Sequence, residues 1–131
     1  MPSKPYQEMK VLVVDDFSAM RKVVIHTITQ IGFKHFNISE ANNGKKAIET
    51  LTKGQFDFII SDWNMPEMTG LQFLKAVRGS KGKYKNIPFL MVTAETEKSM
   101  VNEAVKSGVS NYIIKPFSAS SVDVKIKKIF K

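Results

Sequence analysis

Four short apolar runs and one more polar segment, expected nearer the edge of a sheet, recur along the chain, and each is followed by a stretch with apolar residues at helical spacing. Runs of this length, bounded by turn residues, predict strands that are buried on both faces of a sheet. Because strands and helices alternate, we expect a parallel sheet covered by helices on both faces, which is a three-layer α/β fold. The predicted strands are Val11–Val14, Phe36–Ala41, Asp57–Ser61, Phe89–Val92 and Tyr112–Ile114.

The stretches between these runs predict five helices, because their apolar residues follow the 3.6-residue period. Ser18 is expected to cap the first helix through its hydroxyl. Four of the five stretches run into a glycine, a residue that commonly ends helices. The apolar positions are Met20, Val23, Val24, Ile28 and Ile31; Ala47, Ile48 and Leu51; Leu71, Leu74 and Val77; Met100, Val101, Ala104 and Val105; and Val122, Ile126, Ile129 and Phe130.

The size and composition of the chain narrow its class. A length of 131 residues suits one domain, which we expect over residues 10–131 after a lead-in over residues 1–9. The absence of cysteine excludes disulfides and thiolate metal sites. No run has the length of a membrane span and no signal peptide is recognised, so we expect a cytoplasmic protein without a membrane partner.

The net charge of +8 raises the alternative of a basic nucleic-acid-binding protein. The basic residues are scattered along the chain, however, and no helix-turn-helix or aromatic stacking motif is found. We therefore favour the interpretation that the lysines lie on the solvent faces of helices.

Polar residues with reactive side chains follow the four most apolar runs. Asp15 and Asp16 come after the first, Asp62 after the third, Thr93 after the fourth and Lys115 after the last. Parallel strands place their carboxyl ends at one edge of the sheet, where ligands bind in open α/β sheets. The sequence therefore predicts that three carboxylates, a hydroxyl and an ammonium group meet at this edge.

These residue types together indicate phosphoryl transfer. Three clustered carboxylates need more positive charge than Lys115 supplies, and oxygen ligands without His or Cys favour Mg²⁺. Asp62 stands alone on the central strand, so it is the predicted nucleophile that forms an aspartyl phosphate. We predict that Asp15 and Asp16 hold the metal, that Lys115 pairs with phosphoryl charge and that Thr93 hydrogen-bonds a phosphoryl oxygen.

The same residues, with their neighbours, resemble the receiver domain of bacterial two-component response regulators, and within that family the CheY-like chemotaxis regulators. The similar segments are Val13–Ser18, Ser61–Pro66, Met91–Glu95 and Ile114–Phe117, and the similarity extends over residues 9–131. The resemblance implies a flavodoxin-like (βα)5 fold. The resemblance to CheY-like regulators also implies the strand order 2-1-3-4-5.

The resemblance also implies a signalling role. A chemotaxis histidine kinase would phosphorylate Asp62 in the presence of Mg²⁺, with the backbone carbonyl of Asn64 as a further metal ligand beside Asp15, Asp16 and Asp62. The chain would be a phosphoacceptor that assists its own phosphorylation and dephosphorylation rather than a conventional enzyme. It would act as a monomer, with the flagellar motor switch protein and a phosphatase as further partners.

In this family, side chains at the positions of Asn64 and Glu95 border the phosphoryl group and tune its hydrolysis. Thr93 and Tyr112 are the switch residues, Thr93 moving toward the phosphate and Tyr112 turning inward. The Lys115–Pro116 peptide bond is implied to be cis. Phosphorylation would then change the face formed by the fourth helix, the last strand and the last helix.

Two further alternatives remain open from the sequence. The last helix carries Val124 off its apolar stripe and a strong basic bias, so a paralogue that serves as a phosphate sink or signals to a non-motor partner is the first. The second is a metal-dependent phosphatase that uses an aspartyl phosphate. Such enzymes place a second acid two residues after the nucleophile, and Asn64 occupies that position here.

Overall fold

Five parallel strands form one sheet in the order β2-β1-β3-β4-β5. This computed structural model describes residues 4–80, 82–94 and 98–130. The order and the alternation with helices confirm the predicted doubly wound, flavodoxin-like fold. The strands are β1 (Val11–Val14), β2 (Ile38–Ala41), β3 (Phe58–Asp62), β4 (Phe89–Thr93) and β5 (Asn111–Ile114).

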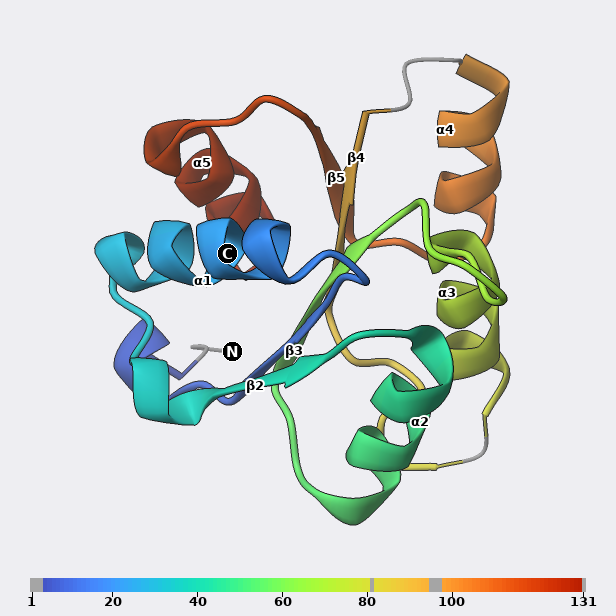
Figure 1. The fold of residues 1–131 in the computed structure, drawn as a ribbon, viewed down its shortest axis with the longest axis horizontal. Coiled ribbons are helices and arrows are strands. Elements are labelled where there is room, and N and C mark those ends of the chain that lie inside the picture. Colours follow the sequence, from blue (N-terminus) through green and yellow to red (C-terminus); the bar gives the residue numbers. More distant parts are fainter. Residues whose placement is uncertain (1–3, 81, 95–97, 131) are drawn as a thin grey trace.

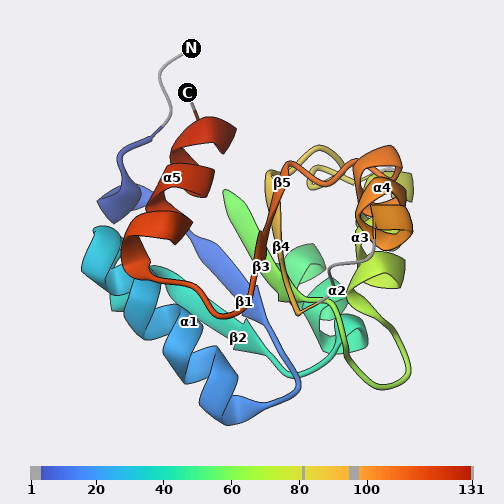
Figure 2. The same ribbon diagram turned by 90° about the horizontal axis from the view of Figure 1, so that it is seen from above.

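Helices cover both faces of the sheet, as the apolar runs predicted. In Figures 1 and 2, α1 and α5 lie against one face, and α2, α3 and α4 lie against the other. The helices are α1 (Ser18–Ile31), α2 (Gly44–Lys53), α3 (Gly70–Gly79), α4 (Lys98–Lys106) and α5 (Ala119–Ile129), with short 3-10 turns η1 (Tyr6–Glu8) and η2 (His35–Asn37). None of the helices within the described ranges combines the length and apolarity that a membrane span requires.

The core consists of two apolar layers, because successive strand residues point to opposite faces of the sheet. In β1, Leu12 and Val14 pack on the side of α2 and α3, whereas Val11 and Val13 pack on the side of α1 and α5. The central strands β1, β3 and β4 are buried along their whole length. Their carboxyl ends are therefore held in a rigid frame.

Helix termini use local chemistry that mostly matches the sequence. Thr69 and Gln72 form a reciprocal capping box at the start of α3. Gly32 ends α1 with a φ of 134°, a conformation that favours glycine. The prediction for Ser18 is wrong. Phe17 occupies the N-cap position, and its side chain makes no capping bond because it has no acceptor atom. In the preceding loop, Asp15 Oδ1 accepts the Phe17 N–H.

The predicted bounds of four strands are also wrong. The second strand begins at Ile38, because residues 35–37 form the η2 turn and leave the Phe36 side chain 82% exposed. The third strand runs from Phe58 to Asp62, so Asp62 is its last residue and does not follow it. The fourth strand extends one residue further, to Thr93, and the fifth begins one residue earlier, at Asn111.

Two valines assigned to apolar stripes face solvent. Val23 is 49% exposed and Val105 is 57% exposed. Each lies one residue, or about 100° of helical turn, from a buried neighbour, Val24 or Ala104. The buried stripes are therefore narrower than the hydrophobic pattern suggested.

Part of the lead-in contacts the core. The Tyr6 ring stacks on Phe33 with 4.4 Å between ring centroids, and the Tyr6 hydroxyl donates to Asp123 Oδ1 on α5 at 3.3 Å. Met9 is buried. The residues before β1 therefore add to the layer formed by α1 and α5.

Candidate functional site

The register of the sheet brings the acidic residues to one level. Val14 of β1 pairs with Ser61 of β3, so the residues that follow them, Asp15 and Asp62, lie side by side at the carboxyl edge. On its other side, Asp62 pairs with Val92 of β4. A shift of one residue in the β1–β3 ladder would separate the carboxylates of Asp15 and Asp62 and turn side chains to the other face.

Backbone hydrogen bonds beyond the paired strands fix the loops that carry the site. The Asp15 N–H donates to the Ala41 carbonyl at 3.1 Å, and the Trp63 N–H donates to the Val92 carbonyl at 3.0 Å. The Lys115 N–H donates to the Thr93 carbonyl at 2.8 Å. These bonds continue the ladders by one residue, so the site residues are positioned by the sheet rather than by flexible loops.

Three carboxylates and one ammonium group meet at this edge. One oxygen from each of Asp15, Asp16 and Asp62 lies within 4.8 Å of the others, and Lys115 Nζ donates to Asp62 Oδ1 at 3.0 Å. Asp15 and Asp62 are buried, whereas Asp16 is exposed. At this separation each pair of carboxylates repels by about 3 kcal/mol in a medium of effective dielectric near 20. A single lysine does not offset that repulsion.

This arrangement disfavours the charged form of Asp15. Burial raises the pKa of the Asp15 carboxyl to about 6, and the charge on Asp62 contributes in the same direction. The Phe17 N–H and the Lys115 ammonium group act in the opposite direction on this pKa without overcoming burial. A divalent cation would remove this penalty, because it replaces the missing positive charge.

The donor set fits a hard cation. The three side chains offer only carboxylate oxygens, which Mg²⁺ prefers, and Mg²⁺ is typically held by few carboxylates with open positions for water or phosphate oxygen. Asp16, the exposed member, leaves the cluster accessible from solvent. Asp15, Asp16 and Asp62 are therefore the residues that could hold the metal.

The remaining predicted site residues lie around this cluster. Thr93 is buried at the end of β4, while Asn64 is exposed in the loop after β3. Tyr112 of β5 is half-buried against the core, with Lys125 Nζ 5.1 Å from the centre of its ring. Glu95 lies outside the described residues. The Lys115–Pro116 peptide bond is cis, as the resemblance implied.

Gly70 is a site residue that the sequence analysis did not single out. A Cβ atom at this position would overlap the carbonyl oxygen of Asp62 and lie 2.9 Å from Trp63 Cα. The Gly70 N–H also donates to the Trp63 carbonyl at 2.7 Å. The available signal was a glycine directly after the capping residue Thr69, where no turn or helix end requires one.

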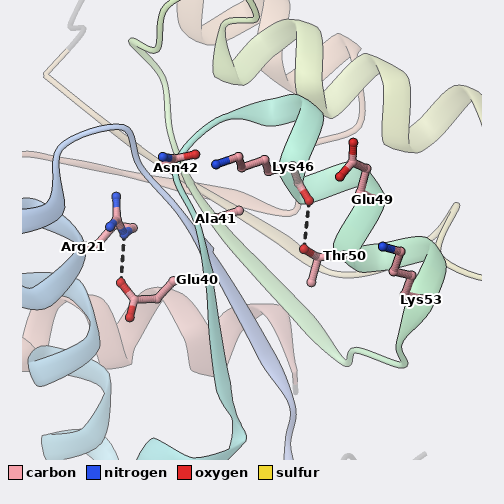
Figure 3. Close-up of a pocket in the computed structure, with 8 residues that line it drawn as sticks. All are labelled: Arg21, Glu40, Ala41, Asn42, Lys46, Glu49, Thr50 and Lys53. Atoms are coloured by element: carbon pink, nitrogen blue, oxygen red, sulfur yellow. Dashed lines mark hydrogen bonds and ion pairs between the residues drawn. The ribbon is translucent and has the colours of Figure 1, made fainter.

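An open cavity of about 400 Å³ lies beside the acidic cluster, between α1, the end of β2 and α2. Its walls are mainly charged, as Figure 3 shows for Arg21, Glu40, Lys46, Glu49 and Lys53. None of the three clustered carboxylates lines it. The cavity is therefore a neighbour of the acidic site and not the site itself.

Comparison with known proteins assigns this architecture to a family. The model of the response regulator receiver domain matches residues 11–127. The chain belongs to the response regulator receiver family. Receiver domains generally bind Mg²⁺ at a cluster of aspartates of the kind formed here by Asp15, Asp16 and Asp62.

Individual receiver proteins are similar over nearly the whole chain. The chemotaxis protein CheY of Pseudomonas aeruginosa is 46% identical over 123 residues, which cover 94% of this chain and 97% of the relative. The chemotaxis protein CheY-3 of Vibrio cholerae is 44% identical over 125 residues, which cover 95% and 94%. The solved structure of Vibrio cholerae CheY4 superposes with a TM-score of 0.82 at 37% identity, covering 92% of this chain and 98% of that one. This chain is thus a CheY-like receiver domain.

Proposed function

We propose that this receiver domain is a chemotaxis response regulator that accepts a phosphoryl group on Asp62 from a histidine kinase in a Mg²⁺-dependent reaction. The observation that carries the proposal is the cluster of three carboxylates within 4.8 Å, with Lys115 Nζ 3.0 Å from Asp62 Oδ1. The similarity to chemotaxis proteins named CheY supports the pathway. We further propose that residues 10–131 form the whole receiver unit and act in the cytoplasm.

The proposed reaction follows from the positions of the side chains. An Asp62 carboxylate oxygen attacks phosphorus as the phosphorus–nitrogen bond to the kinase histidine breaks, and the imidazole nitrogen keeps the bonding electron pair. Lys115 already contacts Asp62, so its ammonium group is placed to pair with phosphoryl charge during the transfer. A bound Mg²⁺ would supply a Lewis acid that neutralises charge on the phosphoryl oxygens. Asp15, Asp16 and the Asn64 carbonyl would hold it beside Asp62.

Phosphate incorporation tests this proposal directly. The purified protein is incubated with a ³²P-phosphorylated chemotaxis kinase, or with acetyl phosphate, in the presence of Mg²⁺ or of EDTA. We expect one phosphoryl group per chain with Mg²⁺, none with EDTA, and none in Asp62→Asn, which keeps the size of the side chain. Equal incorporation into Asp62→Asn would refute the assignment of the phosphoacceptor.

Phosphorylation would change the conformation of the face around β5, where a partner could bind. A phosphoryl group adds roughly 1.5 to 2 negative charges, and it shifts a population only through contacts that exist in one state. Thr93 is the last residue of β4 and Lys115 directly follows β5, which is an edge strand with α4 and α5 on either side of it (Figure 2). We propose Thr93 and Tyr112 as the switch residues and this face as the output surface.

The same face exposes apolar side chains, which are typical of binding surfaces. Ile114 is 39% exposed and Val124 is 53% exposed, on β5 and α5 respectively. We propose the flagellar motor switch protein as the partner, with a phosphatase ending the signal. A pull-down of phosphorylated protein and of Asp62→Asn against the motor switch protein separates this role from a phosphate sink. Equal capture of both forms would reject phosphorylation-gated binding to the motor.

A further inference from the structure

Arg21, in the first turn of α1, joins the acidic loop to strand β2. Its Nη1 donates to the backbone carbonyl of Asp15 at 2.7 Å, and its Nε donates to Glu40 Oε1 at 2.8 Å. Figure 3 shows the guanidinium group of Arg21 turned toward Glu40 across the mouth of the cavity. The Arg21 side chain is 16% exposed and the Glu40 side chain 47% exposed.

We propose that Arg21, oriented by Glu40, is a positioning residue that sets the geometry at which Asp15 meets the divalent cation. This inference rests on the proposed function, since it concerns the same cation site. Arg21 touches no reacting atom in it. It acts through the Asp15 peptide, and Glu40 acts through Arg21.

Three hydrogen bonds hold Asp15 in place, and Arg21 donates one of them. The Asp15 N–H donates to the Ala41 carbonyl at 3.1 Å, and Asp15 Oδ1 accepts the Phe17 N–H at 2.9 Å. The carbonyl bond from Arg21 completes the set. Without it, the peptide after Asp15 is free to rotate, and the carboxylate moves with it. Mg²⁺ requires nearly ideal octahedral geometry, so small displacements of a ligand reduce its affinity.

The planar, two-armed guanidinium group is needed for this role. One arm binds a carboxylate on β2 while another reaches a carbonyl in the β1–α1 loop, which a lysine ammonium group on a flexible stem does not reproduce. Residues that support metal ligands from outside typically change metal affinity by about 10-fold to 100-fold when they are replaced.

If Arg21 only stabilised the fold, its replacement would lower the free energy of unfolding without a specific loss of affinity for Mg²⁺. Its ion pair with Glu40 is partly exposed, and such pairs contribute little to stability. Arg21 lines an open cavity of about 400 Å³, so its shortening creates no enclosed void. The fold of Arg21→Lys is therefore expected to persist, which allows cation binding to be measured on folded protein.

Direct Mg²⁺ titration provides the test. Trp63 is the single tryptophan of the chain, follows Asp62 and is 4% exposed, so its fluorescence reports on the site. For Arg21→Lys we expect the dissociation constant for Mg²⁺ to rise about 10-fold or more. For Glu40→Gln, which keeps an oxygen acceptor but loses the charge, we expect a smaller rise than for Arg21→Lys, because Arg21 is still oriented.

Arg78→Lys is the matched control. Arg78 also donates to backbone carbonyls, with Nε 2.9 Å from Gly108 O and Nη1 2.6 Å from Ile87 O, but neither carbonyl belongs to the acidic loop. The same chemical change at Arg78 should leave the dissociation constant for Mg²⁺ within about 2-fold of wild type. Thermal melts of all variants in EDTA report any general loss of stability.

Phosphorylation by acetyl phosphate gives a second readout. If Arg21 only positions the cation ligand, Arg21→Lys should require at least about 10-fold more Mg²⁺ for half-maximal rate and then reach nearly the wild-type rate. Unchanged Mg²⁺ affinity in Arg21→Lys and Glu40→Gln would overturn the inference. An equal loss of affinity in Arg21→Lys and Arg78→Lys would also overturn it, because the effect would then be general.

The proposed function and this inference fail in distinguishable ways. A wild-type protein that neither binds Mg²⁺ nor takes up phosphate refutes the proposed function, and the inference with it. A wild-type protein that does both, alongside an Arg21→Lys variant with the same Mg²⁺ dependence, refutes only the role of Arg21.

Discussion

Replacing Asp15 by asparagine should stabilise the metal-free protein, although it removes a metal ligand. Burial raises the pKa of the Asp15 carboxyl from 3.8 to about 6. At 1.36 kcal/mol per unit, the ionised carboxylate costs the folded state about 3 kcal/mol relative to its protonated form. Asparagine carries no charge, and its oxygen can still accept the Phe17 N–H that Asp15 Oδ1 accepts at 2.9 Å.

The pH dependence has a definite sign. The folded state binds the Asp15 proton more tightly than the unfolded state, so this residue favours folding when protonated and loses that contribution as pH rises through about 6. By linkage, the cost to the folded state is small near pH 4, grows as pH rises toward 6 and reaches about 3 kcal/mol at pH 8. The advantage of Asp15→Asn should therefore grow from acid to neutral pH.

Urea unfolding in EDTA, followed by Trp63 fluorescence, measures this difference at each pH. Carboxylates outside the acidic cluster contribute equally to both proteins, so their effects cancel when the variant is compared with wild type at the same pH. Addition of Mg²⁺ at pH 8 should stabilise wild type and have little effect on Asp15→Asn, because only the native site binds the cation well. An Asp15→Asn variant no more stable than wild type at pH 8, or one with a pH-independent advantage, would refute this electrostatic account.

Four substitutions test local features. Gly70→Ala should reduce the free energy of unfolding by about 2–3 kcal/mol, because its methyl group meets the Asp62 carbonyl; Gly79→Ala, where nothing lies within 4 Å, should instead be neutral or stabilising in the same urea assay. Glu67 has a φ of 66°, so Glu67→Asn should stabilise on the order of 1 kcal/mol, and a loss of stability would contradict the strain assigned there. Phe36→Ser should change the free energy of unfolding by less than about 0.5 kcal/mol, since the ring is 82% exposed; a larger loss by the same measurement would indicate that Phe36 packs against the core.

Much of the fold could be predicted from local pattern. The runs Val11–Val14 and Phe89–Val92 are apolar throughout because central parallel strands are buried on both faces, and the structure buries both completely. Glycines at the ends of helical stripes also identified helix ends, as Gly32 shows. Where the pattern misled, as at Val23 and Val105, the orientation of a helix on the sheet decided which valines were covered.

The sequence by itself determined the alternating elements and the reactive residues at or next to the strand ends, because burial and helical periodicity are visible as local patterns in the chain. That Asp15, Asp62 and Lys115 belong together followed from the direction of parallel strands. Only the tertiary structure decided their distances, the pKa of Asp15, and the contacts of Arg21 and Gly70 with the acidic loops. Those properties depend on register and on packing between residues far apart in sequence, and no local pattern encodes them.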